Sequence, residues 1–286
     1  MSGFERIGVV GCGLMGSGFA EVCARAGLGV TVVVRGEDAV DRGRGRLVNS
    51  LERARRRGRI GESERDAALE RVSFSTSLKD LRDHDFVLES VSERLQDKLE
   101  VFAELDEIVE NRDAVLASNT SSIPIMKLGR ATRDPGRVAG AHFFNPVPMM
   151  PLVELIGSLR TRPETLERVD AFVTGPLGKE VVRGQDQPGF VVNALLVPYL
   201  LSAVRMLESG AATAEAIDRG MVLGCGHPMG PLALIDLIGL DTIASIGESL
   251  HEELKEPLYA PPPLLLRMIE GGFLGKKSGE GFHPYA

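Results

Sequence analysis

The sequence predicts an α/β fold: a Rossmann-type, doubly wound and mainly parallel sheet followed by a smaller all-helical domain. Short apolar strands alternate with longer helical patterns through the first half of the chain, which is typical of a parallel sheet covered on both faces. A glycine-rich turn follows the first strand, and no strand pattern is visible after residue 184. The length of 286 residues suits about two domains.

The first domain, residues 1–184, contains the elements that such a sheet requires. Apolar and β-branched runs predict strands, at residues 6–10, 30–34, 86–88, 114–116, 138–142 and 152–156. Longer periodic segments predict helices, from the glycine turn to about residue 26, at 38–58 and at 95–110.

The second domain, residues 185–286, has only helical patterns. Helices are expected at residues 191–207, 213–222, 232–248 and 263–271. The two domains are joined by the polar segment 184–189, which contains Pro and Gly.

Composition excludes several functional classes. Thirty-three basic against 40 acidic residues give a net charge of −7, whereas nucleic-acid binders normally carry a basic surface. Cys12, Cys23 and Cys225 form neither a disulfide framework nor a metal-ligand spacing, and they fit a reducing cytoplasm. No targeting signal is recognisable, and the most apolar segment, 190–207, contains Asn, Pro and Arg, which favours a core helix over a membrane span.

The glycine turn has the pattern G-x-G-x-x-G that binds dinucleotides when it lies between a strand and a helix. Its residues are Gly11, Cys12, Gly13, Leu14, Met15 and Gly16. The first glycine permits the tight turn, the second lets the backbone approach the pyrophosphate, and the third permits close packing of helix and sheet.

The end of the second strand bears on the choice between NAD and NADP. An acidic residue normally binds the adenosine ribose there, but this chain has Val34 followed by Arg35. A guanidinium pairs with a 2′-phosphate that a carboxylate would repel, so the pattern favours NADP. Glu37 and Asp38 follow closely and offer carboxylates to the ribose instead.

Arginines recur at residues 53, 55, 56, 57 and 59. Such a run is usually a solvated helix face. The alternative is contact with an anionic substrate handle, such as the phosphates of coenzyme A.

Two polar segments follow predicted strands and are candidates for catalysis. Residues 118–122 are Ser-Asn-Thr-Ser-Ser, at the carboxyl end of a strand, where parallel sheets bind ligands. His142 ends another strand, and Glu154 lies in the strand that returns after a proline-rich connection. A histidine oriented by a carboxylate is a common general base, whereas a lone histidine is more often a core residue. His142, Glu154, Ser121 and Asn145, with Asn193 from the helical domain, would supply a base and hydrogen bonds for hydride transfer.

Six segments together resemble the 3-hydroxyacyl-CoA dehydrogenases, and most closely the bacterial 3-hydroxybutyryl-CoA dehydrogenases. They are the glycine motif, Ser-Asn-Thr-Ser-Ser, His-Phe-Phe-Asn-Pro-Val at 142–147, Gly-Phe-Val-Val-Asn at 189–193, Pro-Met-Gly-Pro at 228–231 and Gly-Lys-Lys-Ser-Gly-Glu-Gly-Phe at 275–282. The resemblance covers essentially the whole chain, in order.

The resemblance implies reversible oxidation of (S)-3-hydroxyacyl-CoA to 3-oxoacyl-CoA. It implies that His142 is the base, that Glu154 stabilises its imidazolium, and that a homodimer forms through the helical domain. It further implies that the substrate oxygen or thioester is contacted by Ser121, Asn145 and Asn193. The nicotinamide half of the cofactor would be contacted by Glu93, Lys98 and Asn119, and coenzyme A by Ser50 and Arg57.

Two positions depart from the family pattern. NAD is the family default, but Val34 with Arg35 replaces the usual acid. His227 stands where the family often has Tyr, which favours a packing role.

Other functions remain as alternatives. The same chemistry could act on a hydroxyacyl group bound to an acyl carrier protein, or on a hydroxy sugar acid such as gulonate. A nucleotide-binding protein without catalysis is a third class, against which the His142 and Glu154 pair argues.

Overall fold

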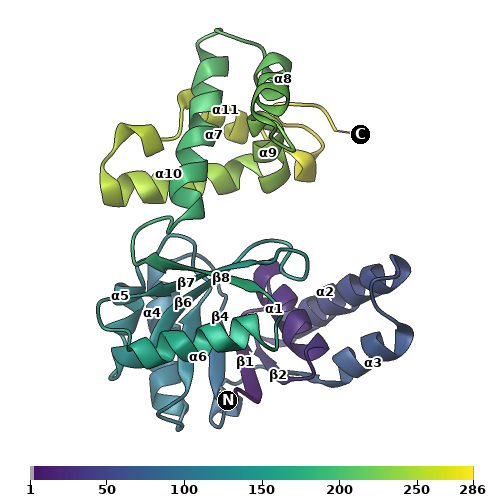
Figure 1. Ribbon diagram of the computed structural model, residues 1–286, viewed down its shortest axis with the longest axis vertical. Helices are drawn as coiled ribbons and strands as arrows, with labels where there is room; N and C mark the ends of the chain where they lie inside the picture. The colour runs from purple at the N-terminus through teal and green to yellow at the C-terminus, as the bar shows by residue number, and fades with distance from the viewer. Residues whose placement is uncertain (1–2, 286) are drawn as a thin grey trace. The chain divides into compact units, whose positions relative to one another are not determined.

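The computed structural model describes residues 3–285 and divides the chain into two compact units, Met1–Gln187 and Pro188–Ala286. The division falls inside the polar segment 184–189, in which the sequence places the boundary after residue 184. The ribbon shows strands and helices in the first unit and helices in the second (Figure 1). The predicted fold class is therefore confirmed.

The first unit contains an eight-stranded sheet of order β3-β2-β1-β4-β5-β6-β7-β8. Its strands are β1 (Arg6–Val10), β2 (Gly29–Val33), β3 (Val72–Ser75), β4 (Phe86–Glu89), β5 (Val115–Ser118), β6 (Val138–Phe143), β7 (Leu152–Gly157) and β8 (Glu180–Gln185). All neighbours pair in parallel except β6 and β7, which are antiparallel. The carboxyl ends of the first six strands therefore share one edge, at which polar side chains gather.

Helices cover both faces of this sheet (Figure 1). They are α1 (Leu14–Arg25), α2 (Glu37–Arg56), α3 (Glu62–Glu70), α4 (Leu95–Ile108), α5 (Ile125–Gly129) and α6 (Pro163–Thr174), with short 3-10 turns η1 (Leu78–Leu81) and η2 (Pro135–Arg137). On one face, Phe19 of α1 and Phe172 of α6 contact Phe86 of β4. The next residue along β4, Val87, points to the opposite face, where Leu81 of η1 approaches Gly8. The apolar runs of the strands thus fill two core layers.

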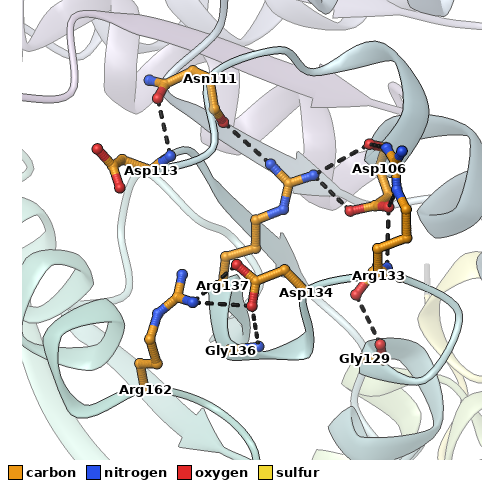
Figure 2. Close-up of polar contacts among 10 residues, drawn as sticks. Asp106, Asn111, Asp113, Gly129, Arg133, Asp134, Gly136, Arg137 and Arg162 are labelled. Carbon is orange, nitrogen blue, oxygen red and sulfur yellow. Dashed lines mark hydrogen bonds and ion pairs between the residues drawn. The ribbon is translucent and has the colours of Figure 1, made fainter.

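A buried ion-pair cluster lies before the amino-terminal ends of β5 and β6 (Figure 2). The Arg137 side chain is almost fully buried, and its guanidinium lies 2.7 Å from Asp106 Oδ1 and 3.2 Å from the Asn111 carbonyl oxygen. Arg133 Nε lies 2.6 Å from Asp106 Oδ2. These bonds join the end of α4 to the two connections that lead into β5 and β6.

The second unit contains α7 (Val192–Glu208), α8 (Ala214–Cys225), α9 (Pro231–Ile238), α10 (Leu240–Leu254) and α11 (Pro263–Glu270), with short turns η3 (Pro257–Tyr259) and η4 (Lys276–Ser278). Its own apolar core includes Leu201, Val204, Ile235 and Leu250. None of the helices within residues 3–285 has both the length and the apolar composition that a bilayer crossing needs.

The sequence pattern joined two helices into one and missed several elements. The sequence predicts one helix over 232–248, but Gly239 adopts a φ of 110° and separates α9 from α10. The sequence pattern also missed α3, α5, α6, β3 and β8.

Candidate active site

The glycine turn forms a cradle at the carboxyl end of β1. Gly11 has a φ of 94°, which favours glycine, and a Cβ there would lie 2.5 Å from the Ser90 carbonyl oxygen. A Cβ on Gly16 would collide with the Gly11 carbonyl oxygen, whereas one on Gly13 would meet no protein atom within 4 Å. The structure therefore needs glycine at 11 and 16 for its own packing, and at 13 it leaves space for a ligand.

The start of α1 fits a dinucleotide pyrophosphate. Among residues 3–285 no side chain caps this helix terminus, so its first N–H groups can bind phosphate oxygens. Leu14 is 68% exposed beside them, and Met15 is partly buried. These observations agree with the cofactor role that the glycine pattern predicts.

The end of β2 presents no carboxylate at the expected position. Val34 is buried, and its N–H donates to the Ser75 carbonyl oxygen over 3.0 Å. Arg35 is exposed and forms no salt bridge with the residues described. The guanidinium of Arg46, on α2, donates to the Cys12 carbonyl oxygen over 3.1 Å, which places a second cation beside the glycine turn.

The antiparallel pairing of β6 with β7 sets His142 directly opposite Glu154. His142 Nδ1 lies 2.6 Å from Glu154 Oε2, and both side chains are buried. An ionised carboxylate only accepts hydrogen bonds, so this contact assigns the proton to Nδ1. The lone pair of Nε2 then faces the Ser121 hydroxyl, 3.0 Å away. The arrangement is that of a general base oriented by a carboxylate.

The segment 118–122 is held in place by Glu93. The Glu93 carboxylate accepts hydrogen bonds from the Thr120 hydroxyl and from the N–H of Ser121, the latter over 2.9 Å. Partial burial raises the pKa of Glu93, but Lys98 and these hydrogen bonds outweigh it and leave the pKa below 4.5. Glu93 therefore remains ionised and fixes the backbone that carries Ser121.

Lys98 lies between two carboxylates. Its ammonium is 2.7 Å from Glu89 Oε1 and 3.2 Å from Glu93 Oε2, and its side chain is 1% exposed. Glu89 is fully buried at the carboxyl end of β4 and also accepts from the Ser118 hydroxyl over 2.6 Å. Polar contacts thus run without a break from Glu89 to Glu93 and on to the segment that carries Ser121.

Sequence reasoning missed Glu89. The available signal was its place directly after the predicted strand 86–88, where the carboxyl end of a parallel strand meets the ligand edge.

Three predicted asparagines have different surroundings. Asn119 is buried, and its Oδ1 accepts from the Phe143 N–H over 2.8 Å, which joins the ends of β5 and β6. Asn145 is exposed on the connection between β6 and β7. Asn193 is 9% exposed in the first turn of α7, in the other unit, so its predicted contact with the substrate stays a prediction.

The two residues predicted to contact coenzyme A lie on or beside α2. Ser50 is partly buried and lies near the buried Glu21 of α1. Arg57 is the exposed residue that ends α2. The neighbouring Arg55 and Arg56 have a carboxylate partner within the protein, because both form ion pairs with Glu52.

Comparison with known proteins identifies the family. Residues 6–187 match the family model for the NAD binding domain of 3-hydroxyacyl-CoA dehydrogenase, and residues 189–285 match the model for its C-terminal domain. A 3-hydroxybutyryl-CoA dehydrogenase of Mycobacterium tuberculosis is 58% identical over 281 residues, with 98% of each chain covered. A probable 3-hydroxybutyryl-CoA dehydrogenase of Bacillus subtilis is 44% identical, with 98% of this chain and 97% of the relative covered.

Solved structures of the family have a similar fold. The crystal structure of FadB2 from M. tuberculosis has a TM-score of 0.98 at 58% identity, covering 99% of both chains. That of (S)-3-hydroxybutyryl-CoA dehydrogenase from Ralstonia eutropha has a TM-score of 0.93 at 42% identity, covering 99% of this chain and all of the other. The chain therefore belongs to the 3-hydroxyacyl-CoA dehydrogenase family, with a nicotinamide cofactor and an acyl-CoA substrate.

Proposed function

We propose that this protein interconverts (S)-3-hydroxyacyl-CoA and 3-oxoacyl-CoA, with 3-hydroxybutyryl-CoA as the favoured substrate. The observation that carries the proposal is the chain Ser121–His142–Glu154 at the same sheet edge as the glycine turn. The names of the relatives support the short acyl chain.

The chain's own residues account for the proton transfer. His142 Nε2 accepts the proton of the 3-hydroxyl group, and Glu154, 2.6 Å from Nδ1, stabilises the imidazolium that results. The Ser121 hydroxyl donates a hydrogen bond to the substrate oxygen, which is becoming a carbonyl. A bound nicotinamide supplies the hydride acceptor. In the reverse direction His142 returns the proton.

The remaining predicted residues bind and orient. Gly11, Gly13 and Gly16 with Leu14 and Met15 would hold the pyrophosphate, and Glu93, Lys98 and Asn119 would shape the site for the nicotinamide. Asn145 and Asn193 would contact the thioester part of the substrate, and Ser50 and Arg57 would contact coenzyme A. In this division of tasks, the α/β unit carries the cofactor and the base.

Turnover of acetoacetyl-CoA tests the function. The purified protein should oxidise a reduced nicotinamide cofactor when acetoacetyl-CoA is added, and the activity should fall as the acyl chain lengthens. Absence of turnover with every CoA thioester would refute the proposal.

For the cofactor, we propose NADP rather than NAD. Arg35 is exposed and without a salt bridge among the described residues, and buried Val34 has no carboxylate to repel a 2′-phosphate. A hydrogen bond to a charged group contributes about 1.5–3 kcal/mol, so kcat/KM with NADPH should exceed that with NADH by about tenfold or more. Arg35→Ser should remove most of this preference. A clear preference of the wild-type protein for NADH would overturn the assignment.

An acyl carrier protein is the alternative thioester carrier. It shares the phosphopantetheine arm with coenzyme A, and the exposed Arg53, Arg57 and Arg59 would suit its acidic surface as well as they suit phosphates. Comparing kcat/KM for acetoacetyl-CoA and for acetoacetyl carrier protein decides between them, and we expect the CoA thioester to be preferred. A free sugar acid such as gulonate should not be turned over.

We also propose a homodimer through the helical unit. Large apolar side chains are exposed on this unit, as on other interaction surfaces: Leu195, Leu223, Leu237 and Leu266. Light scattering after gel filtration should give twice the chain mass of 30.8 kDa, and Leu223→Glu should shift the mass towards the monomer.

A further inference from the structure

The connection between β6 and β7, residues 144–151, carries Asn145 and joins the strand of the base to the strand of its carboxylate. We propose that Lys179 is a positioning residue for the reaction, because its buried ammonium fixes this connection against the cofactor helix α1. The inference rests on the proposed function, since it assigns a task within that site.

Lys179 lies between α6 and β8 and is 8% exposed. Its ammonium donates to the carbonyl oxygens of Val147 and Met150, both over 2.7 Å. It forms no salt bridge with the residues described, and burial lowers its pKa below 10.5. A buried ammonium normally pairs with a carboxylate, so a charge used only to hold two loop carbonyls is costly for stability alone.

The same connection also packs against α1. A Cβ on Gly18 would lie 2.9 Å from Cβ of Val147 and 3.4 Å from Cδ of Pro148. Only glycine lets the connection come this close to the helix that begins at the cofactor turn. Val147, 2% exposed, is therefore fixed between Gly18 and Lys179.

The connection also contacts the base. The Phe144 ring lies against the His142 ring, with centroids 4.7 Å apart. Asn145 is exposed, and the 49% exposed Met149 contacts the Arg59 guanidinium beyond α2. Release of the Lys179 bonds would therefore displace Asn145, the residue of this connection that is predicted to contact the substrate. The ladder between β6 and β7 would still keep His142 opposite Glu154.

Because Lys179 holds the connection and the β6–β7 ladder holds the base, loss of Lys179 should change KM more than kcat. Lys179→Met keeps the length of the side chain and removes both hydrogen bonds. We expect KM and the calorimetric Kd for acetoacetyl-CoA to rise about tenfold, with kcat changed less than about threefold, because misplaced contacts weaken binding while the base stays in place. The Kd of the reduced cofactor should stay within about twofold.

A second variant perturbs the same contact without touching the charge. Gly18→Ala pushes on Val147 from α1 and should reproduce the rise in KM. Arg162→Met is the control, since it removes a long cation from an exposed ion pair with Asp134, near the opposite ends of the strands. Its kinetic constants should match those of the wild type.

Wild-type KM and Kd for acetoacetyl-CoA in folded Lys179→Met would overturn the proposal. So would a loss of activity that follows only the fraction of folded protein. If Lys179→Met does not fold, Gly18→Ala decides by the same readouts. A wild-type protein that binds acetoacetyl-CoA without turnover would refute the proposed function alone, and the Kd series would still decide the role of Lys179. A wild type that does not bind it would overturn both.

Discussion

His142 owes its orientation to a strand register that the sequence only suggests. The sequence predicts a base paired with Glu154 from the residue types and from a returning strand, since a histidine oriented by a carboxylate is a common general base. The distance of 2.6 Å depends on the antiparallel pairing of β6 and β7, which places the two residues directly opposite each other.

Replacement of Glu154 separates charge from geometry. Glu154→Gln keeps a hydrogen-bond acceptor for Nδ1 but removes the negative charge that stabilises the imidazolium. We expect kcat to fall at least about 100-fold, which is the lower end of the contribution of general acid–base catalysis. Cofactor binding should be unchanged, as checked by fluorescence titration. A variant that retains half of the wild-type kcat would show that the charge is not needed.

Other polar residues of the site were harder to predict. Glu93 and Lys98 entered only through family resemblance, and Glu89 was missed, because single charged residues at strand ends are common in any sequence. Their significance comes from burial, since the ammonium of Lys98 lies between the two carboxylates inside the protein. Burial of that kind depends on tertiary packing.

Elements with a continuous apolar pattern were predicted, and the edges of the sheet were not. Strands β1, β4, β5 and β6 are almost entirely buried. The missed strands β3 and β8 are the two edge strands, and every residue of β8 is exposed or partly buried. Edge strands carry polar residues that weaken the apolar signal. Helices α9 and α10 appeared as one, because the apolar pattern continues across Gly239.

Two glycines of the same turn should respond differently to alanine. A Cβ on Gly16 collides with the Gly11 carbonyl oxygen, whereas Gly13 has open space and a φ of −70°. Gly16→Ala should lower the melting temperature. Gly13→Ala should fold normally and weaken binding of the reduced cofactor about tenfold or more, because the backbone must approach the pyrophosphate there. Calorimetry and fluorescence titration measure the two effects. Normal cofactor binding in Gly13→Ala would contradict the location of the pyrophosphate.

Stability of the α/β unit depends on the cluster of Figure 2. Burial raises the pKa of Asp106, but hydrogen bonds from Arg133 and Arg137 outweigh it and leave the pKa below 3.8. A depressed folded-state pKa means that the carboxylate stabilises the fold above about pH 4 and that this stabilisation is lost as the pH falls towards the folded pKa.

Asp106→Asn tests that assignment. It should reduce the free energy of unfolding at neutral pH by about 3–5 kcal/mol, as expected when a buried charge loses its partner. Below about pH 4 the difference from the wild type should shrink, because the wild-type carboxyl also loses its charge. Urea unfolding followed by circular dichroism measures both values. A difference that stays constant from pH 7 to about pH 3 would contradict the role of the charge.

The net charge of the whole molecule does not indicate the charge of its ligands. The total of −7 argues against nucleic acid, yet Arg35, Arg46 and Arg57 lie exposed on the unit that carries the glycine turn. Anionic ligands would be recognised by these placed cations within an acidic protein.

The most direct test of the account is the rate of acetoacetyl-CoA reduction by wild-type protein and by His142→Ala, with cofactor binding measured on both. We predict turnover by the wild type and a loss of at least about 100-fold in kcat for the variant, with unchanged cofactor affinity. Full activity of His142→Ala, or no reduction of the thioester by the wild type, would contradict it.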